Sequence, residues 1–120
     1  MKILSRDIKI KQDVAFGEMV TEQFFVQSKK YVFNLHFVYS FKYGLTIRAF
    51  SIFHGKTSRI IGVCDCDITK KSVRKAIADD EQWRFNCSDI SRINDMKKCL
   101  NMLVNEIFDK AQVQVILSGI

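Results

Sequence analysis

The sequence contains no proline and only five glycines in 120 residues, so the residues that most often interrupt regular structure are scarce. This scarcity argues against flexible linkers and low-complexity segments. The chain also lacks a run of about 20 apolar residues, the length that crosses a bilayer as a helix. We therefore expect a single compact domain over residues 1–120 that makes no use of a membrane.

The first residues lack the apolar core of a signal peptide. Lys2, Arg6 and Asp7 restore charge before an apolar segment of about seven residues can form, so we expect a cytoplasmic protein. The four cysteines, at positions 64, 66, 87 and 99, are then expected to be free thiols. Their spacing differs from the roughly two to four intervening residues typical of each half of a structural zinc site, so we expect neither a metal nor another cofactor.

Acidic residues are absent between Glu22 and Asp65, although six basic residues lie there. Residues 1–62 carry ten basic and four acidic side chains, whereas residues 63–120 carry nine of each, in agreement with the 19 and 13 of the whole chain. The net charge of +6 therefore comes entirely from the first half of the sequence. Such an asymmetry builds a positive field that favours an anionic partner, either a nucleic acid or an acidic protein surface.

The first two-thirds of the sequence has the period of two that is typical of strands. In 31–41 the odd positions are aromatic or apolar, while Asn34, His36 and Ser40 occupy even positions, as in a strand with one buried face. The same reasoning predicts further strands at 6–11, 19–27, 45–54 and 59–65.

The last third changes to helical spacing. A first amphipathic helix, capped by Asp67 or Thr69, is expected to run through Trp83. A second helix, beginning between 88 and 91, carries apolar residues at three- and four-residue intervals. A strand over 112–117 is expected to follow. This order predicts an α+β fold in which an antiparallel meander of about five strands, plus a C-terminal strand, packs two helices on one face.

The loop between the two central strands determines their expected register. Residues 42–44 form a three-residue hairpin loop in which Gly44 takes the left-handed conformation that a side chain disfavours. This loop would pair Tyr39 with Ile47 and place the odd-numbered apolar residues of both strands on one face.

The even positions of these strands would then lie on the face away from the helices. Contiguous apolar, aromatic and basic side chains on an open face are typical of a surface that contacts a partner. Burial of the face by the N-terminal strands or by a second copy of the chain is the alternative. Trp83 and Arg84 have side chains that are common in binding hot spots, with core packing as the alternative for Trp83. The expected partner-binding residues are His36, Arg48, Phe50, Ile52, His54, Lys56, Trp83 and Arg84.

No motif of nucleotide binding or nucleophilic catalysis occurs in the sequence. His36 and His54 are the two histidines, and they fall five or more residue steps apart in the expected sheet, too far to act on one phosphate. We therefore expect a small non-enzymatic protein-binding module, for example an immunity protein or antitoxin that neutralises a toxin domain. Its partner would present an acidic surface.

The alternative is an RNA- or DNA-binding protein that uses the basic part of the N-terminal sheet. In that case basic side chains would contact phosphates, and the affinity would fall steeply with salt. No closely spaced aromatic motif of a known RNA-binding sheet occurs, however. The residues expected to contact nucleic acid are Lys29, Lys30, Arg48, Lys56 and Arg59.

Overall fold

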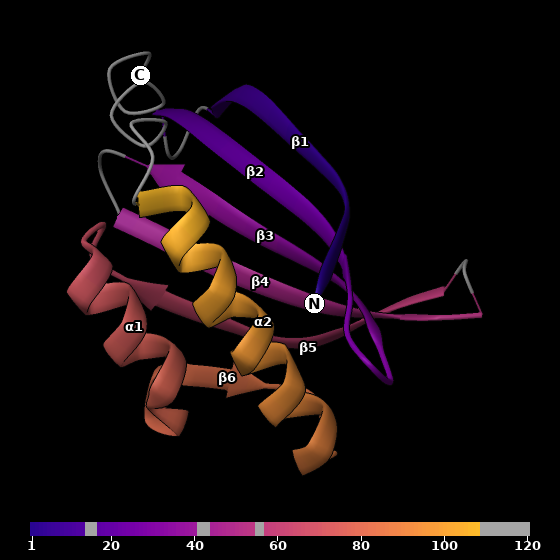
Figure 1. The fold of residues 1–120 in the computed structure, drawn as a ribbon. Helices are drawn as coiled ribbons and strands as arrows, with labels where there is room; N and C mark the ends of the chain where they lie inside the picture. Colours follow the sequence, from indigo (N-terminus) through magenta and orange to yellow (C-terminus); the bar gives the residue numbers. More distant parts are fainter. Residues whose placement is uncertain (14–16, 41–43, 55–56, 109–120) are drawn as a thin grey trace.

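The computed structural model describes residues 1–13, 17–40, 44–54 and 57–108 (Figure 1). These residues form one antiparallel sheet in which each strand pairs with its neighbour in sequence, in the order β1-β2-β3-β4-β5-β6. The predicted α+β class is confirmed. The elements are β1 (Lys2–Asp13), β2 (Gly17–Gln27), β3 (Val32–Ser40), β4 (Gly44–Phe53), β5 (Thr57–Cys66), α1 (Lys70–Ala78), a 3-10 turn (Asp80–Gln82), β6 (Trp83–Phe85) and α2 (Ile90–Phe108).

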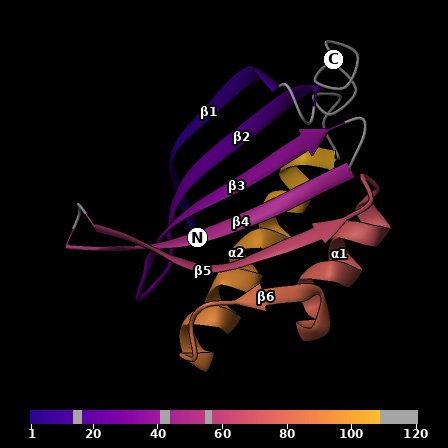
Figure 2. The same ribbon diagram turned by 180° about the vertical axis from the view of Figure 1, so that it is seen from behind.

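Both helices lie on the same side of the sheet, as Figures 1 and 2 show from opposite directions. The strand alternation explains this arrangement, because the odd-numbered side chains of β3 and β4, except Ser51, are apolar and point to the helices. Burying each of these large side chains contributes roughly 1.5–3 kcal/mol. The fully buried residues of this layer are Phe33, Leu35, Phe37, Tyr39, Leu45, Ile47 and Ala49 from the sheet, and Met96, Leu100, Leu103, Val104 and Ile107 from α2.

The first helix is shorter than predicted. Thr69 caps it as expected, since its hydroxyl oxygen accepts a hydrogen bond from the Ser72 backbone N–H. It ends at Ala78 because Asp79 adopts an extended conformation. Trp83, which we expected at the end of the helix, begins the short strand β6 and pairs with Cys64. Three residues are too few to show a periodic pattern, so β6 was not predicted.

The sixth strand is thus β6, which lies between the two helices in sequence. The predicted strand at 112–117 falls outside the described residues. The second helix begins at Ile90, and Asp89 caps it by accepting a hydrogen bond from the Arg92 backbone N–H. The expected meander and helix pair are therefore present, together with the unpredicted strand β6.

The β3–β4 register differs from the predicted one by two residues. Tyr39 pairs with Leu45, two residues earlier in β4 than expected, and Ser40 pairs with Gly44. Gly44 has the predicted left-handed conformation, with φ of +84°, and a Cβ there would lie 2.7 Å from the Cys66 carbonyl oxygen. A shift of two residues keeps every side chain on the same face, so the expected open face is unchanged.

The N-terminal strands extend the sheet beyond β3. β1 pairs edge to edge with β2, so these strands continue the same layer, and the open face is buried at Val38 and Ser40, which are 6% and 5% exposed. An ion pair joins β1 to β2. Glu22 of β2 is fully buried on the helix side, and Arg6 of β1 donates from Nε to its Oε2 at 2.9 Å. The Arg6 guanidinium also lies over the Phe24 ring, 5.1 Å from the centroid. A buried carboxylate thus depends on a cation from the edge strand.

Arg6→Ala should destabilise the protein by about 3 kcal/mol, because it leaves the Glu22 carboxylate buried without its counter-ion. Urea denaturation followed by circular dichroism measures the loss. The double variant Arg6→Met with Glu22→Leu removes both charges and should recover most of the stability. Lys9→Ala is the control, since the exposed Lys9–Asp7 pair spans 3.8 Å and should contribute little. Equal stabilities of Arg6→Ala and wild type would contradict the assigned role of the pair.

Candidate functional site

The open face, defined as the sheet surface away from the helices, has a basic centre. His36 of β3 lies directly between Gln23 of β2 and Arg48 of β4, and Arg48 lies opposite Val63 of β5. The His36 ring also contacts Phe50, with centroids 5.0 Å apart and planes at 44°. The face therefore combines an imidazole, a guanidinium and an aromatic ring on two adjacent strands, as the sequence predicted.

The surroundings of His36 favour its neutral form. Partial burial is the largest cause that lowers its pKa below the ordinary 6.5, and the positive charges of Arg48 and Lys9 add to it. Its Nε2 atom is buried and has no hydrogen-bond partner among the described residues, and the same holds for Oδ1 of Asn34 on the same face. Unsatisfied buried atoms of this kind typically cost about 1–3 kcal/mol each. The open face thus carries unused hydrogen-bonding capacity just below its surface.

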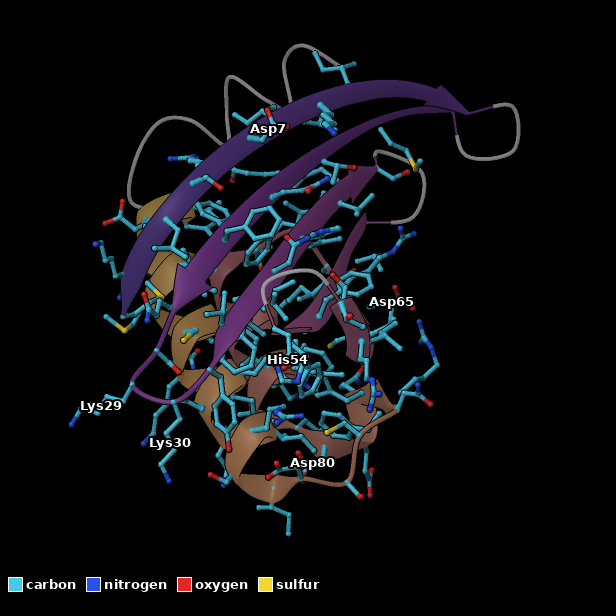
Figure 3. The ribbon with its side chains drawn as sticks, turned by 90° about the vertical axis from the view of Figure 1, so that its right-hand side faces the viewer. Asp7, Lys29, Lys30, His54, Asp65 and Asp80 are labelled. Carbon is cyan, nitrogen blue, oxygen red and sulfur yellow. The ribbon has the colours of Figure 1, made fainter. Side chains whose placement is uncertain are left out.

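The basic groups at the two sides of the open face are paired with carboxylates. Arg84 Nη1 lies 3.0 Å from Asp65 Oδ2, and the Thr46 hydroxyl donates to Asp65 Oδ1 at 2.7 Å. At the other side, on β1, Lys9 lies near Asp7. Figure 3 shows Asp7 and Asp65 far apart on the sheet. Arg48, between them, has no ion-pair partner within the described part of the chain.

Trp83 is a core residue, which corrects its assignment to the partner surface. Its side chain points to the helices because it alternates with Arg84, and it is only 6% exposed. The indole N–H donates to the Ile77 carbonyl at 3.1 Å, and the ring stacks on Phe85 with centroids 5.4 Å apart. Lys56, another expected contact residue, lies outside the described residues.

A pocket of about 690 Å³ opens at one end of the sheet, which faces the viewer in Figure 3. We refer to it as the end pocket. The turn between β2 and β3, the start of α2, and the adjoining ends of β4 and β5 meet there. The two expected contact residues Ile52 and His54 belong to it, so it is continuous with the open face. It is lined by Phe25, Lys30, Tyr31, Val32, Ser51, Ile52, Phe53, His54, Ser58 and Arg92.

Arg92 is the main basic group of the end pocket that sequence reasoning missed. Its guanidinium carbon lies 4.5 Å from the Phe53 ring centroid and 4.9 Å from that of Tyr31. Arg59, one of the residues expected to bind nucleic acid, lies over the Phe53 ring at 5.3 Å. The stack joins three elements that are distant in sequence, and no periodic pattern or motif could have indicated it.

The residues of the nucleic-acid alternative are divided between two places. Lys29 and Lys30 project from the turn between β2 and β3, where Figure 3 shows both pointing away from the sheet. Arg59 lies beside the end pocket, whereas Arg48 is at the centre of the open face. The positive charge of the first half of the sequence is therefore spread over one face and one end.

The two histidines are not brought together. His36 pairs with Arg48, and His54 follows six residues further along the same strand direction, roughly 20 Å away by strand geometry. His54 itself has a positive φ of 50° immediately after β4. A shared acid and base for one phosphate would need both rings within hydrogen-bond reach of it, which this separation does not provide.

The cysteines show no metal-binding arrangement in the described residues, where no three histidine, cysteine or acidic side chains are grouped to hold an ion. Burial is the largest cause that raises the pKa of Cys64 to about 11 and that of Cys66 to about 12. Both therefore stay protonated at neutral pH. Cys64 instead packs in the core and donates to the Ala76 carbonyl.

Comparisons with known proteins identify no relative. No protein-family model, no curated protein and no solved structure matches this chain. Among the described helices, none is long and apolar enough to cross a membrane. Inference about function therefore depends on the open face and the end pocket.

The stability of the fold should decrease as the pH is lowered through about 6.5, the ordinary pKa of histidine. The folded pKa of His36 is lowered, so the unfolded chain takes up the proton first and acid favours unfolding. His36→Gln should flatten this dependence. Urea midpoints of wild type and variant at several values between pH 5 and 8 provide the test. Parallel curves for the two proteins would contradict the lowered pKa.

Proposed function

We propose that the protein is a small binding module whose open face holds a protein partner with an acidic surface, as an immunity protein or antitoxin holds a toxin domain. The observation that carries this proposal is Arg48 at the centre of the face, for which the described part of the chain supplies no ion-pair partner. Described carboxylates neutralise the cations at both sides, yet none pairs with Arg48. A carboxylate of a partner would supply the missing counter-charge.

The surroundings of Arg48 support a protein partner. Phe50 lies opposite Ile60, Ile52 lies opposite Val32, and all four side chains are partly exposed. These cross-strand pairs form an apolar band across the face beside the basic centre. A central arginine surrounded by apolar side chains is typical of an interface hot spot. When a partner covers such an arginine, water is removed from the guanidinium and from the partner group that pairs with it.

A nucleic acid is the second candidate, and one observation favours it. Lys29 and Lys30 project together from one turn, and Arg59 lies at the same end of the sheet. Such a cluster suits phosphate contacts, and binding through it would weaken steeply with salt. It would depend on the lysines of the turn and much less on Arg48, so variants separate the two candidates.

Arg48→Glu should abolish or strongly weaken capture of a stoichiometric protein by the tagged chain from nuclease-treated lysate of the source cell. We expect the Kd for that protein to rise at least about 30-fold, the effect of losing a hot spot worth 2 kcal/mol. Titration calorimetry with the purified partner measures it. Lys71→Glu makes the same charge change on an exposed residue of α1, on the opposite side of the sheet, and should bind like wild type.

Two results would contradict the protein-binding proposal. One is capture that Arg48→Glu and Lys71→Glu affect equally. The other is recovery of nucleic acid alone, lost with salt and with charge reversal at Lys29 and Lys30, which would establish the second candidate instead.

A further inference from the structure

The end pocket contains a cation that the fold holds in place. The guanidinium of Arg92 lies close to both the Tyr31 and Phe53 rings, so its side chain is fixed before any ligand arrives. Tyr31 is fixed in turn, since its hydroxyl contacts that of Ser91 at 3.4 Å and its ring packs against Phe33. A group that is already ordered loses little conformational entropy when it binds.

The donors of Arg92 are largely unused. A guanidinium has five N–H groups in a planar fork that matches a carboxylate. Among the described residues it forms one long ion pair, with Asp89, whose Oδ2 lies 3.9 Å from Nη2 and so beyond hydrogen-bond distance. Its Nε is buried without a hydrogen-bond partner among the same residues. The fixed cation therefore has capacity for an anion.

The charged side chains along the described pocket wall are basic. Lys30 and His54 line it together with Arg92, and Arg59 lies over the Phe53 ring. No aspartate or glutamate is among the described residues that line it. An anionic group entering the pocket would meet two or more cations and no described carboxylate on its walls.

The remaining walls suit an anion carried on a short apolar stem. Phe25, Val32 and Ile52 supply an apolar surface, and the hydroxyl groups of Ser51 and Ser58 add polar partners. At about 690 Å³ the pocket is within the usual range of sites that accept small ligands. It can therefore hold an acidic side chain together with part of the segment that carries it.

Stacking of nucleobases is less favoured here than binding of a carboxylate. Single-stranded nucleic acids bind largely by stacking bases on free aromatic faces. The Phe53 ring already carries the guanidinium groups of Arg92 and Arg59, and the Tyr31 ring lies between Arg92 and Phe33. The aromatic rings of the pocket therefore serve to hold arginines.

We propose that the end pocket binds an aspartate or glutamate side chain of the acidic protein partner, with the carboxylate on the Arg92 guanidinium and the stem against Phe25 and Ile52. The inference rests on the proposed function and names a second contact point for the same partner. Because Ile52 belongs to both the open face and the pocket, a partner that covers the face reaches the pocket without a gap.

The test is a titration of the ¹⁵N-labelled full chain, followed by NMR, with the blocked dipeptide acetyl-Leu-Glu-amide. We expect saturable shifts confined to the pocket residues, and much weaker binding of acetyl-Leu-Gln-amide. Arg92→Gln should raise the Kd of the glutamate peptide about 10- to 100-fold, the usual contribution of a hydrogen bond to a charged group. Lys71→Gln, on exposed α1, should leave the Kd unchanged.

Lys30→Glu provides a second variant that does not touch the aromatic stack. Lys30 is exposed in its turn, so its replacement should preserve the fold while weakening the glutamate peptide several-fold. Retained dispersion of the NMR spectrum shows whether Arg92→Gln is folded. If it is not, the Lys30→Glu titration alone decides, and an unchanged Kd then overturns the proposal.

Three further results would overturn the proposal: equal binding of the glutamate and glutamine peptides, shifts outside the pocket, or tighter binding of inorganic phosphate or of an oligothymidylate at Arg92. The last result would identify a phosphate site. Failure here is distinguishable from failure of the proposed function. A partner captured in an Arg48-dependent way, with no glutamate peptide bound, removes the pocket proposal alone.

Discussion

The burial of the odd-numbered side chains of β3 and β4 beneath α2 is the interaction on which the rest of the structure depends. Phe37 and Ile47 face each other in the middle of this layer, and Leu100 of α2 is buried in the same core. Because side chains alternate along a strand, burying one series commits the other to the opposite face. The position of His36 and Arg48 is thus a consequence of the core.

The same packing positions the end pocket. Met96 and Leu100 anchor α2 in the core, and Arg92 lies one turn before Met96 on the same side of the helix. Helix α2 therefore places the Arg92 guanidinium against Tyr31 and Phe53, and α2 cannot shift without opening the core. A site built in this way has the rigidity of a helix and a sheet, which favours recognition of a defined shape over adaptable contact.

The sequence allowed the sheet, its faces and the long second helix to be predicted, because each depends on a repeating pattern of several residues. It did not allow β6 to be predicted, since a three-residue strand has no period. It also misplaced the β3–β4 register, since a register shift of two residues preserves the same faces. Trp83 shows a related limit. The direction of its side chain depends on the pairing of β6 with β5, whereas the sequence predicts a helix up to this residue. Arg92 shows another, because three segments distant in sequence supply the stack that holds it.

The charges of the open face explain why its centre matters more than its sides. Exposed pairs such as Arg84 with Asp65 are screened by water and salt, so they contribute little to affinity even when a partner approaches. Arg48 differs, because it has no ion-pair partner within the described ranges, so a partner of the proposed kind that covers the apolar band would remove water from an uncompensated guanidinium. A carboxylate placed there gains a charge-assisted hydrogen bond in a dry environment, whereas an apolar or basic group would leave the guanidinium buried and unpaired. Under the proposed function, the same arrangement would both attract an acidic partner and reject others.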